Sequence, residues 1–453
     1  MTKAPPRRFI PGLALEDWWA VVIGLFLVAV GCLVFRVGFG LNDIAATPQP
    51  WTSLAELYDQ LAGDVSRYLA VACTLLSLFT AAAFGLGLPP FRFALVFIIL
   101  LALAFATLLI AAWVPVWQVG MEPPVIALCL GAVLGNLIAL PSWIKEGLRA
   151  ELYIKTGVVL LGATVPLPLL RLAGPVTIFQ ASAIALVTFI TIYGVARFLG
   201  VNRQLSAMLA GGGSVCGVSA TIAIAGAVRA RREDISIATT MVVAWSLGMI
   251  VLLPLLARAW YLPAGPAGAW IGSSEFADAA GFAAVQVYSG LLRGATLMGS
   301  ADQALWAFTL VKVIGRDMWI GMWAAAISVY AMLRWQTADG TRLEPSQIWH
   351  RFPKFIIGFV IASTLIAWTN QGTSVADYNS IAGPRLIGPL AALRELMFNL
   401  SFLSIGASMR LRKLMPVGGN AFIAFAAGVV VNLVLGFILS AVIFQDHWNS
   451  LTR

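Results

Sequence analysis

Two short segments of this sequence combine glycine, hydroxyl and acidic side chains within apolar surroundings. The first, GGGSVCGVSAT, runs from Gly211 to Thr221, and the second, GSSEFADAAGF, runs from Gly272 to Phe282. Glycines let the backbone approach a ligand closely, and a helix that begins just after them points free N–H groups and its positive dipole end at that ligand. We therefore predict an anion site whose substrate-binding residues are Gly212, Gly213, Ser214, Cys216, Gly217, Ser219, Ser273 and Ser274. The alternative is close helix packing through small residues.

The second segment also carries two carboxylates, Glu275 and Asp278. A carboxylate at membrane depth is costly and is functional by default. We predict that Asp278 couples transport to a proton or holds a cation, although an N-cap near the outer surface is an almost equal alternative. For Glu275 a surface position is favoured.

A third group of charges lies near the centre of the apolar segment Ala304–Trp323. Lys312 and Arg316 are four residues apart, so on an α-helix they share a face and repel each other. Their counter-ion is Asp278, Glu275 or an anionic substrate, because Asp317 on an adjacent face helps only partly. We predict that Lys312 or Arg316 neutralises the substrate; the alternatives are satisfaction by Asp317 and backbone carbonyls, or snorkelling towards a span end.

The composition requires a membrane to surround these residues. Of 453 residues, 60% are hydrophobic and 11% are charged, against roughly 25% charged in soluble chains. The net charge of +9 is explained by Lys and Arg in cytoplasmic loops, so no nucleic-acid partner is expected. Four cysteines without a CxxC pair and two histidines in polar ends indicate no disulfide framework, no metal site and no cofactor.

Hydropathy predicts an all-α polytopic membrane protein with about eleven transmembrane helices. The windows of roughly 20 residues that a bilayer requires are 18–38, 63–87, 92–116, 124–140, 153–170, 174–197, 233–258, 303–333, 354–370, 388–409 and 417–444. The stretches 205–229 and 268–292 are too rich in small residues for ordinary spans and are predicted to be re-entrant or broken helices. Re-entry of the first keeps Arg229, Arg231 and Arg232 inside, with the N-terminus cytoplasmic.

A weak internal repeat pairs the two unusual stretches. A shift of 59 residues places Gly213 on Gly272 and Ser214 on Ser273, with Ser219 opposite Asp278. Two inverted halves, typical of secondary transporters, would explain this pattern. The predicted division is a cytoplasmic tail (1–17), N-terminal spans (18–116), a transporter core of two inverted halves (124–444) and a short C-terminal tail (445–453).

These motifs resemble the YeiH family, UPF0324-type bacterial inner-membrane proteins described as sulfate exporters. The resemblance rests on GGGSVCGVSATIAIAGAV (Gly211–Val228) followed by REDISIATTMVV (Arg232–Val243), and is supported by WIGSSEFADAAGFAA (Trp270–Ala284) and TLVKVIGRD (Thr309–Asp317). It implies the fold of the cation/proton antiporter and bile-acid transporter group and export of a sulfur oxyanion or related organic anion. Many short members have a histidine just before the acid, where this chain has Ala277, and the spans at 63–116 look additional.

Together these features predict an inner-membrane secondary transporter that moves a small anion, sulfate-like, sulfite or an organosulfonate, by alternating access. No Walker loop or HExxH motif is present, so an enzyme is not expected, and a proton or sodium gradient is the expected coupling source. The alternatives are a cation/proton antiporter and a non-transporting membrane receptor or assembly subunit. The expected partners are the anion, the coupling ion and the lipid bilayer, and a homo-oligomer is left open.

Overall fold

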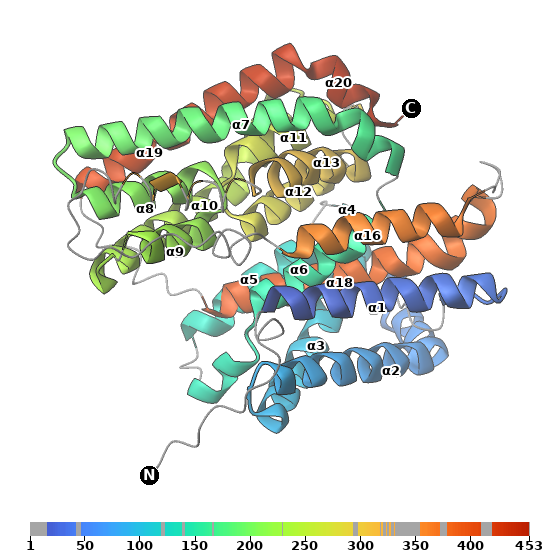
Figure 1. Ribbon diagram of the computed structural model, residues 1–453. Helices are drawn as coiled ribbons and strands as arrows, with labels where there is room; N and C mark the ends of the chain where they lie inside the picture. Colours follow the sequence, from blue (N-terminus) through green and yellow to red (C-terminus); the bar gives the residue numbers. More distant parts are fainter. Residues whose placement is uncertain are drawn as a thin grey trace, which may run out of the picture. The chain divides into compact units, whose positions relative to one another are not determined.

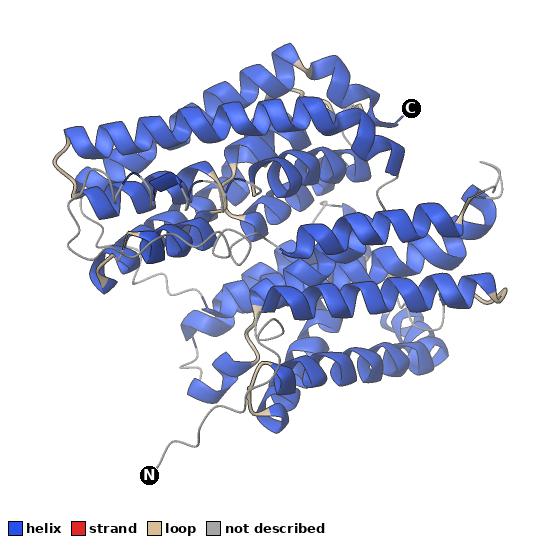
Figure 2. Ribbon diagram, viewed as in Figure 1, coloured by secondary structure: helices blue, strands red, loops and turns tan. Residues whose placement is uncertain are grey.

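The protein is described by a computed structural model that covers 16–41, 47–118, 123–137, 141–164, 167–228, 230–292, 298–317, 319, 323, 326–327, 330, 354–371, 378–408 and 419–452. Helices make up nearly all of this part of the chain, and it contains no β-strand (Figures 1 and 2). A single isolated β-bridge within the same residues pairs Trp51 with Trp113. The prediction of an all-α protein is confirmed.

The chain divides into two compact units, each built from two separate stretches of sequence. Unit 1 comprises Met1–Pro168 and Lys354–Arg410. Its described helices are α1 (Glu16–Arg36), α2 (Leu54–Gly85), α3 (Pro90–Ala112), α4 (Val114–Gln118), α5 (Pro123–Leu137), η2 (Ser142–Glu146), α6 (Ala150–Gly162), α16 (Lys354–Thr369), η4 (Tyr378–Ile387) and α18 (Gly388–Ser408).

Helix α18 packs on both α5 and α6 and forms the centre of unit 1. Small residues make the approach to α5 close. A Cβ atom on Gly131 or Gly135 would overlap the backbone of Leu403 or Ala407, and one on Gly406 would overlap the backbone of α5. This spacing of glycines four residues apart is a known means of close helix packing in membranes.

Unit 2 comprises Leu169–Pro353 and Leu411–Arg453 and contains all of the predicted site residues. Its described helices are α7 (Leu167–Phe198, beginning at the boundary with unit 1), α8 (Arg203–Ser214), α9 (Gly217–Ala227), α10 (Arg232–Ala259), α11 (Ala264–Ser274), α12 (Asp278–Leu292), α13 (Ala301–Thr309), η3 (Leu310–Arg316), α19 (Gly419–Phe437), η6 (Ile438–Ile443), α20 (Gln445–Asn449) and η7 (Ser450–Thr452). Helix α10 packs against α8, α9 and α12, whereas α11 packs against α13 and α19.

Both small-residue stretches form two half-helices separated by a short break, as the sequence predicts for broken or re-entrant segments. The first break lies between α8 and α9 at Val215 and Cys216, and α9 begins at Gly217 with φ +51°. That left-handed conformation favours glycine. The second break separates α11 from α12 at Glu275–Ala277, where Glu275 is extended. The shift of 59 residues places Ser214, the last residue of α8, on Ser273, one residue before the end of α11.

Seven helices of the described part are long and apolar enough to cross a membrane. The predicted span 153–170 is wrong in its extent, because α6 ends at Gly162 and α7 begins at Leu167. The predicted span 303–333 begins with the nine residues of α13, and much of its second half lies outside the described residues. Two shorter apolar helices, α5 and α16, match the windows 124–140 and 354–370.

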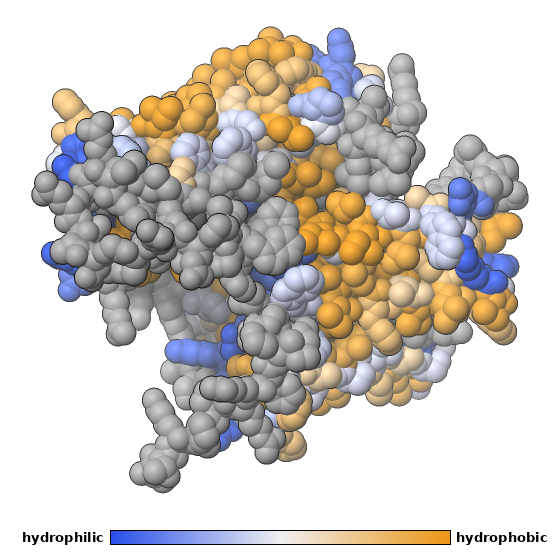
Figure 3. All heavy atoms as spheres, viewed as in Figure 1, coloured by the Kyte–Doolittle hydropathy of each residue, from blue (hydrophilic) through white to orange (hydrophobic). Residues whose placement is uncertain are grey.

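The exposed side chains of these helices are largely apolar, as lipid contact requires. Exposed residues include Phe26 on α1, Phe179 and Ile190 on α7, and Ile423 and Val430 on α19. Hydrophobic residues also cover much of the face in view (Figure 3). The chain is therefore a polytopic α-helical membrane protein. The topology, the domain boundaries and the inverted relation of the two halves stay predictions, and residues 1–15 of the N-terminal tail lie outside the described residues.

Candidate functional site

The breaks of the two interrupted helices meet around Arg316, the last residue of η3. Its guanidinium donates to carbonyl oxygens at the end of α8, Gly213 (3.2 Å) and Ser214 (2.9 and 3.2 Å). It also donates to Gly272 (3.2 Å), Ser273 (2.7 Å) and Glu275 (3.0 Å) at the end of α11. Arg316 is completely buried, and all three of its nitrogens are bonded to main-chain oxygens.

Lys312 forms a second charged centre one turn earlier. Its Nζ lies 2.6 Å from Asp278 Oδ1 and 2.9 Å from Asp317 Oδ1, and it donates to the Val215 carbonyl at 2.9 Å. The side chains of Lys312 and Asp317 are fully buried, whereas that of Asp278 is 18% exposed. Asp278 is therefore the most exposed of these three side chains.

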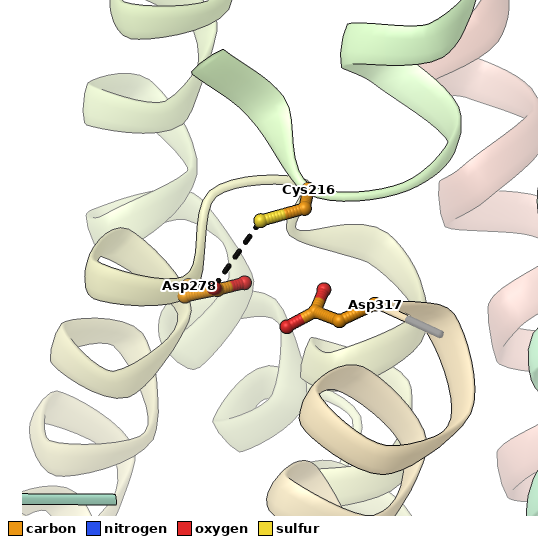
Figure 4. A group of neighbouring side chains, drawn as sticks. All are labelled: Cys216, Asp278 and Asp317. Carbon is orange, nitrogen blue, oxygen red and sulfur yellow. Dashed lines mark hydrogen bonds between the residues drawn. The ribbon is translucent and has the colours of Figure 1, made fainter. Parts of the chain in front are cut away.

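Cys216, Asp278 and Asp317 point towards one another from three different segments (Figure 4). The Cys216 thiol donates to Asp278 Oδ2 at 3.2 Å. One sulfur or oxygen atom from each of these three residues lies within 4.8 Å of the others. We call Cys216, Asp278, Lys312 and Asp317 the charged cluster. Its Lys312 ammonium supplies the positive charge that two neighbouring carboxylates need.

The π-helical turn η3 explains why Asp317 contributes more than the sequence suggested. In a π-turn the backbone bond runs from residue i to residue i+5, and Asp317 N–H donates to the Lys312 carbonyl at 3.2 Å. The side chains of Lys312 and Asp317 therefore meet, which α-helical spacing does not predict. Lys312 pairs with the two carboxylates and a carbonyl, whereas Arg316 binds main-chain carbonyls, so the two cations share no counter-ion. The arrangement matches the alternative of satisfaction by Asp317 and backbone carbonyls, with Asp278 as a further partner of Lys312.

The surface position expected for Glu275 was also wrong, because its side chain is completely buried. Its Oε1 accepts the N–H groups of Phe276 and Ala277, both at 3.0 Å. These amides lie in the break before α12, where the chain has no regular helical partners. The carboxylate of Glu275 therefore accepts the hydrogen bonds of two backbone amides at the break between the helices.

The predicted hydroxyl residues hydrogen-bond partly within their own helices and partly to neighbouring helices. Ser273 Oγ donates to the Ala269 carbonyl (2.8 Å) and accepts from Gln180 (2.8 Å), while Ser274 Oγ donates to the Asn432 carbonyl (3.1 Å). Ser214 is buried and its Oγ reaches the Gly211 carbonyl at 3.4 Å. Ser219 belongs to α9, but its side chain lies outside the described residues.

Close packing also accounts for the triple glycine. A Cβ on Gly211 would overlap Ile224, one on Gly212 would overlap Thr221, and one on Gly213 would overlap Ile192. Both the packing interpretation and the ligand interpretation thus have a structural counterpart in this segment: the glycines allow helices to approach, and the break that follows them exposes helix ends.

Two amide side chains that the sequence does not single out as site residues form hydrogen bonds to residues next to the two breaks. Asn432 on α19 donates to the Gly213 carbonyl at 3.0 Å and accepts from Thr188 at 2.5 Å. Gln180 on α7 donates to Ser273 at 2.8 Å and to Ser440 at 2.7 Å. Intramembrane amides usually join helices in this way. The position of these two amides within apolar windows is the feature of the sequence that could have indicated their contacts.

The fold and this site define a polytopic membrane protein with two interrupted helices joined by buried charges. The chain belongs to the family described as conserved hypothetical protein 698, whose model matches residues 93–425. Its relatives are UPF0324 membrane proteins, so the resemblance to the YeiH family is confirmed.

Three relatives show the range of similarity. The chain is 30% identical to a UPF0324 membrane protein of Rhodopirellula baltica over 89% of this chain and 72% of the relative. It is 32% identical to one of Nitratidesulfovibrio vulgaris over 74% of this chain, but it spans only 56% of that relative. A Nitrosomonas europaea relative is 27% identical over 95% of this chain and 96% of its own length. No solved structure matches this chain.

Proposed function

We propose that this protein is a secondary transporter that moves a small anion, sulfate-like, sulfite or an organosulfonate, by alternating access. The observation that carries the proposal is the meeting of two interrupted helices at a buried charged cluster. Interrupted helices at substrate and ion sites are a recurring feature of secondary transporters, because their free ends supply oriented partial charges. Export across the inner membrane is the direction that the family resemblance implies.

The anion would bind at the helix ends that begin after the breaks. Helix α9 begins at Gly217 and α12 begins at Asp278, and both N-termini carry positive partial charge. Cys216 and Gly217 lie at the first of these ends. Lys312 supplies a full positive charge close by, whereas Arg316 acts on carbonyls and not on the substrate.

Asp278 would couple anion movement to a proton. It shares Lys312 with Asp317, and it is the partly exposed member of the pair. A proton on Asp278 would release part of the Lys312 charge to an anion, so occupancy by the proton and by the anion would be linked. The direction of transport then depends on the relative sizes of the two gradients.

The test is transport by purified protein in liposomes. Labelled sulfate, sulfite and methanesulfonate are each supplied under an imposed proton gradient or sodium gradient, with protein-free liposomes as the baseline. We expect flux of at least one anion above this baseline. Failure of all three under both gradients contradicts the proposed substrate class.

A cation/proton antiporter is the second candidate, and one observation favours it. Cys216, Asp278 and Asp317 bring a sulfur and two carboxylate oxygens within 4.8 Å of one another. Carboxylate oxygens are typical cation ligands. In this function Asp278 is indispensable and Lys312 is dispensable, which is the reverse of what an anion carrier requires of Lys312.

Cys216 offers a direct check on where the anion binds. In a variant that keeps Cys216 and has serine at 32, 73 and 129, a bound anion should slow labelling by a small polar methanethiosulfonate, because the thiol lies at the start of α9 beside Asp278. Mass spectrometry of the intact protein measures the labelling rate with and without sulfate or methanesulfonate, neither of which reacts with the reagent. Equal rates at saturating concentrations of an anion that the protein transports would place the binding site away from this motif.

A further inference from the structure

Arg316 is bound in a way that leaves none of its three nitrogens without a main-chain partner. Its nitrogens bond five carbonyl oxygens, those of Gly213, Ser214, Gly272, Ser273 and Glu275. A guanidinium has five N–H donors in a fixed plane and keeps its charge in proteins. Arg316 therefore contributes a permanent positive charge to the junction of the breaks.

The carbonyls that surround Arg316 are those that a helix end leaves unpaired. Gly213 and Ser214 end α8, Gly272 and Ser273 lie in the last turn of α11, and Glu275 follows it. Each helix C-terminus carries about half of a negative elementary charge, so two ends together match about one positive charge. A ring of such oxygens is also what coordinates sodium in unwound transporter helices.

We propose that Arg316 is an internal cation that permanently fills the junction of the two interrupted helices, in the place where a metal cation would otherwise be needed, so that coupling does not use sodium. This inference rests on the proposed transport function and extends it to the coupling ion. Within the described site, the carboxylates of Asp278, Asp317 and Glu275 are then the groups left to carry a coupling proton, and Asp278 is the most exposed of them. Arg316 is a positioning residue in this account, since it holds both helix ends and does not contact the substrate.

The test replaces Arg316 with alanine and asks whether a free cation refills the carbonyl ring. Thermal unfolding of purified protein in detergent is measured in choline chloride, and then with guanidinium or sodium replacing choline at equal ionic strength and at concentrations too low to denature. We expect Arg316→Ala to melt at a lower temperature than the wild type. Guanidinium or sodium should raise its melting temperature in a saturable way, while the wild type shows no such rise.

Arg394→Ala is the matched control. Arg394 is a partly buried arginine of α18 in unit 1, and its described hydrogen bond runs to the Thr164 hydroxyl at 2.9 Å, in contrast to the main-chain carbonyls that Arg316 binds. Neither cation should restore its stability. If Arg316→Ala responds to cations no more than Arg394→Ala does, the proposal is wrong.

The wild type gives an independent measurement if Arg316→Ala cannot be purified. Exchanging choline for sodium should change neither its melting temperature nor any anion flux that it supports in liposomes. A saturable sodium effect on either quantity overturns the inference while the transport function stands. Absence of flux for every anion under every gradient would instead contradict the proposed function, and the melting comparison would still decide the role of Arg316.

Discussion

Replacing Lys312 with methionine is expected to destabilise unit 2 and to abolish anion transport. The substitution leaves Asp278 and Asp317 close together without the ammonium that lies 2.6 and 2.9 Å from their oxygens. Breaking a buried ion pair by removing one partner typically costs about 3–5 kcal/mol, because the remaining charge is uncompensated. Thermal or denaturant unfolding in detergent measures the loss of stability, and liposome flux per folded molecule measures transport.

Two further variants make this prediction specific. Lys312→Met combined with Asp317→Asn removes one charge of each sign and should recover part of the lost stability, since the two residues are coupled. Lys155→Met is the matched control: Lys155 also bridges two carboxylates, Asp17 and Glu151, each at 2.8 Å, but in unit 1 and with more exposed partners. We expect a smaller loss of stability and retained flux. Full anion flux in Lys312→Met would contradict the role of Lys312 in anion binding, whereas cation/proton exchange that survives Lys312→Met would favour the antiporter.

Asp278→Asn is expected to reduce proton-driven flux to the level of empty liposomes while leaving the fold intact. An amide keeps the size of the carboxyl group but cannot carry the coupling proton. Lys312 retains Asp317 as its partner at 2.9 Å, so the buried ammonium is not left uncompensated. The measurement is anion flux with and without an imposed pH gradient, with the unfolding temperature recorded on the same preparation.

Asp302→Asn controls for the position of the carboxylate in its helix. Asp278 and Asp302 both lie in the first turn of a helix, α12 and α13, but Asp302 is exposed and outside the charged cluster. Loss of a carboxylate near a helix N-terminus costs about 0.3–1 kcal/mol at an exposed position such as that of Asp302. Retained proton-driven flux in Asp278→Asn would exclude the coupling role. If both Asp278→Asn and Lys312→Met leave cellular function unchanged, the non-transporting receptor or assembly subunit becomes the better account.

The sequence predicts the helical class, the two interrupted stretches and the residues at their breaks, because composition and glycine spacing are local signals. It also identifies Lys312, Arg316 and Asp278 as charges that need partners. The partners themselves depend on tertiary structure: Arg316 reaches carbonyls about 40 and 100 positions away in the chain. Main-chain oxygens carry no sequence signal, so no pattern of side chains could have indicated them.

The burial of Glu275 was missed, and the contact of Asp317 with Lys312 was predicted only as partial compensation or as an alternative. From the sequence, Glu275 is expected to be a surface carboxylate. In the structure, the break before α12 leaves two backbone N–H groups from which its carboxylate accepts hydrogen bonds. Helical periodicity of about 3.6 residues per turn places Asp317 on a different face from Lys312. The two side chains meet because η3 is a π-turn. The first difference arises from an unpredicted loop geometry and the second from an unpredicted helix type.

The π-turn of η3 also has a mechanical consequence. It contains more chain per turn than an α-helix, and each residue of an α-helix contributes about 1.5 Å of rise and about 100° of rotation. Rewinding of Leu310–Arg316 into α-helical form would therefore turn Asp317 away from Lys312 by roughly one residue's rotation without breaking the chain. The segment that holds both Lys312 and Arg316 thus owes the contact between Lys312 and Asp317 to its π-helical winding, while α13 before it packs on α11.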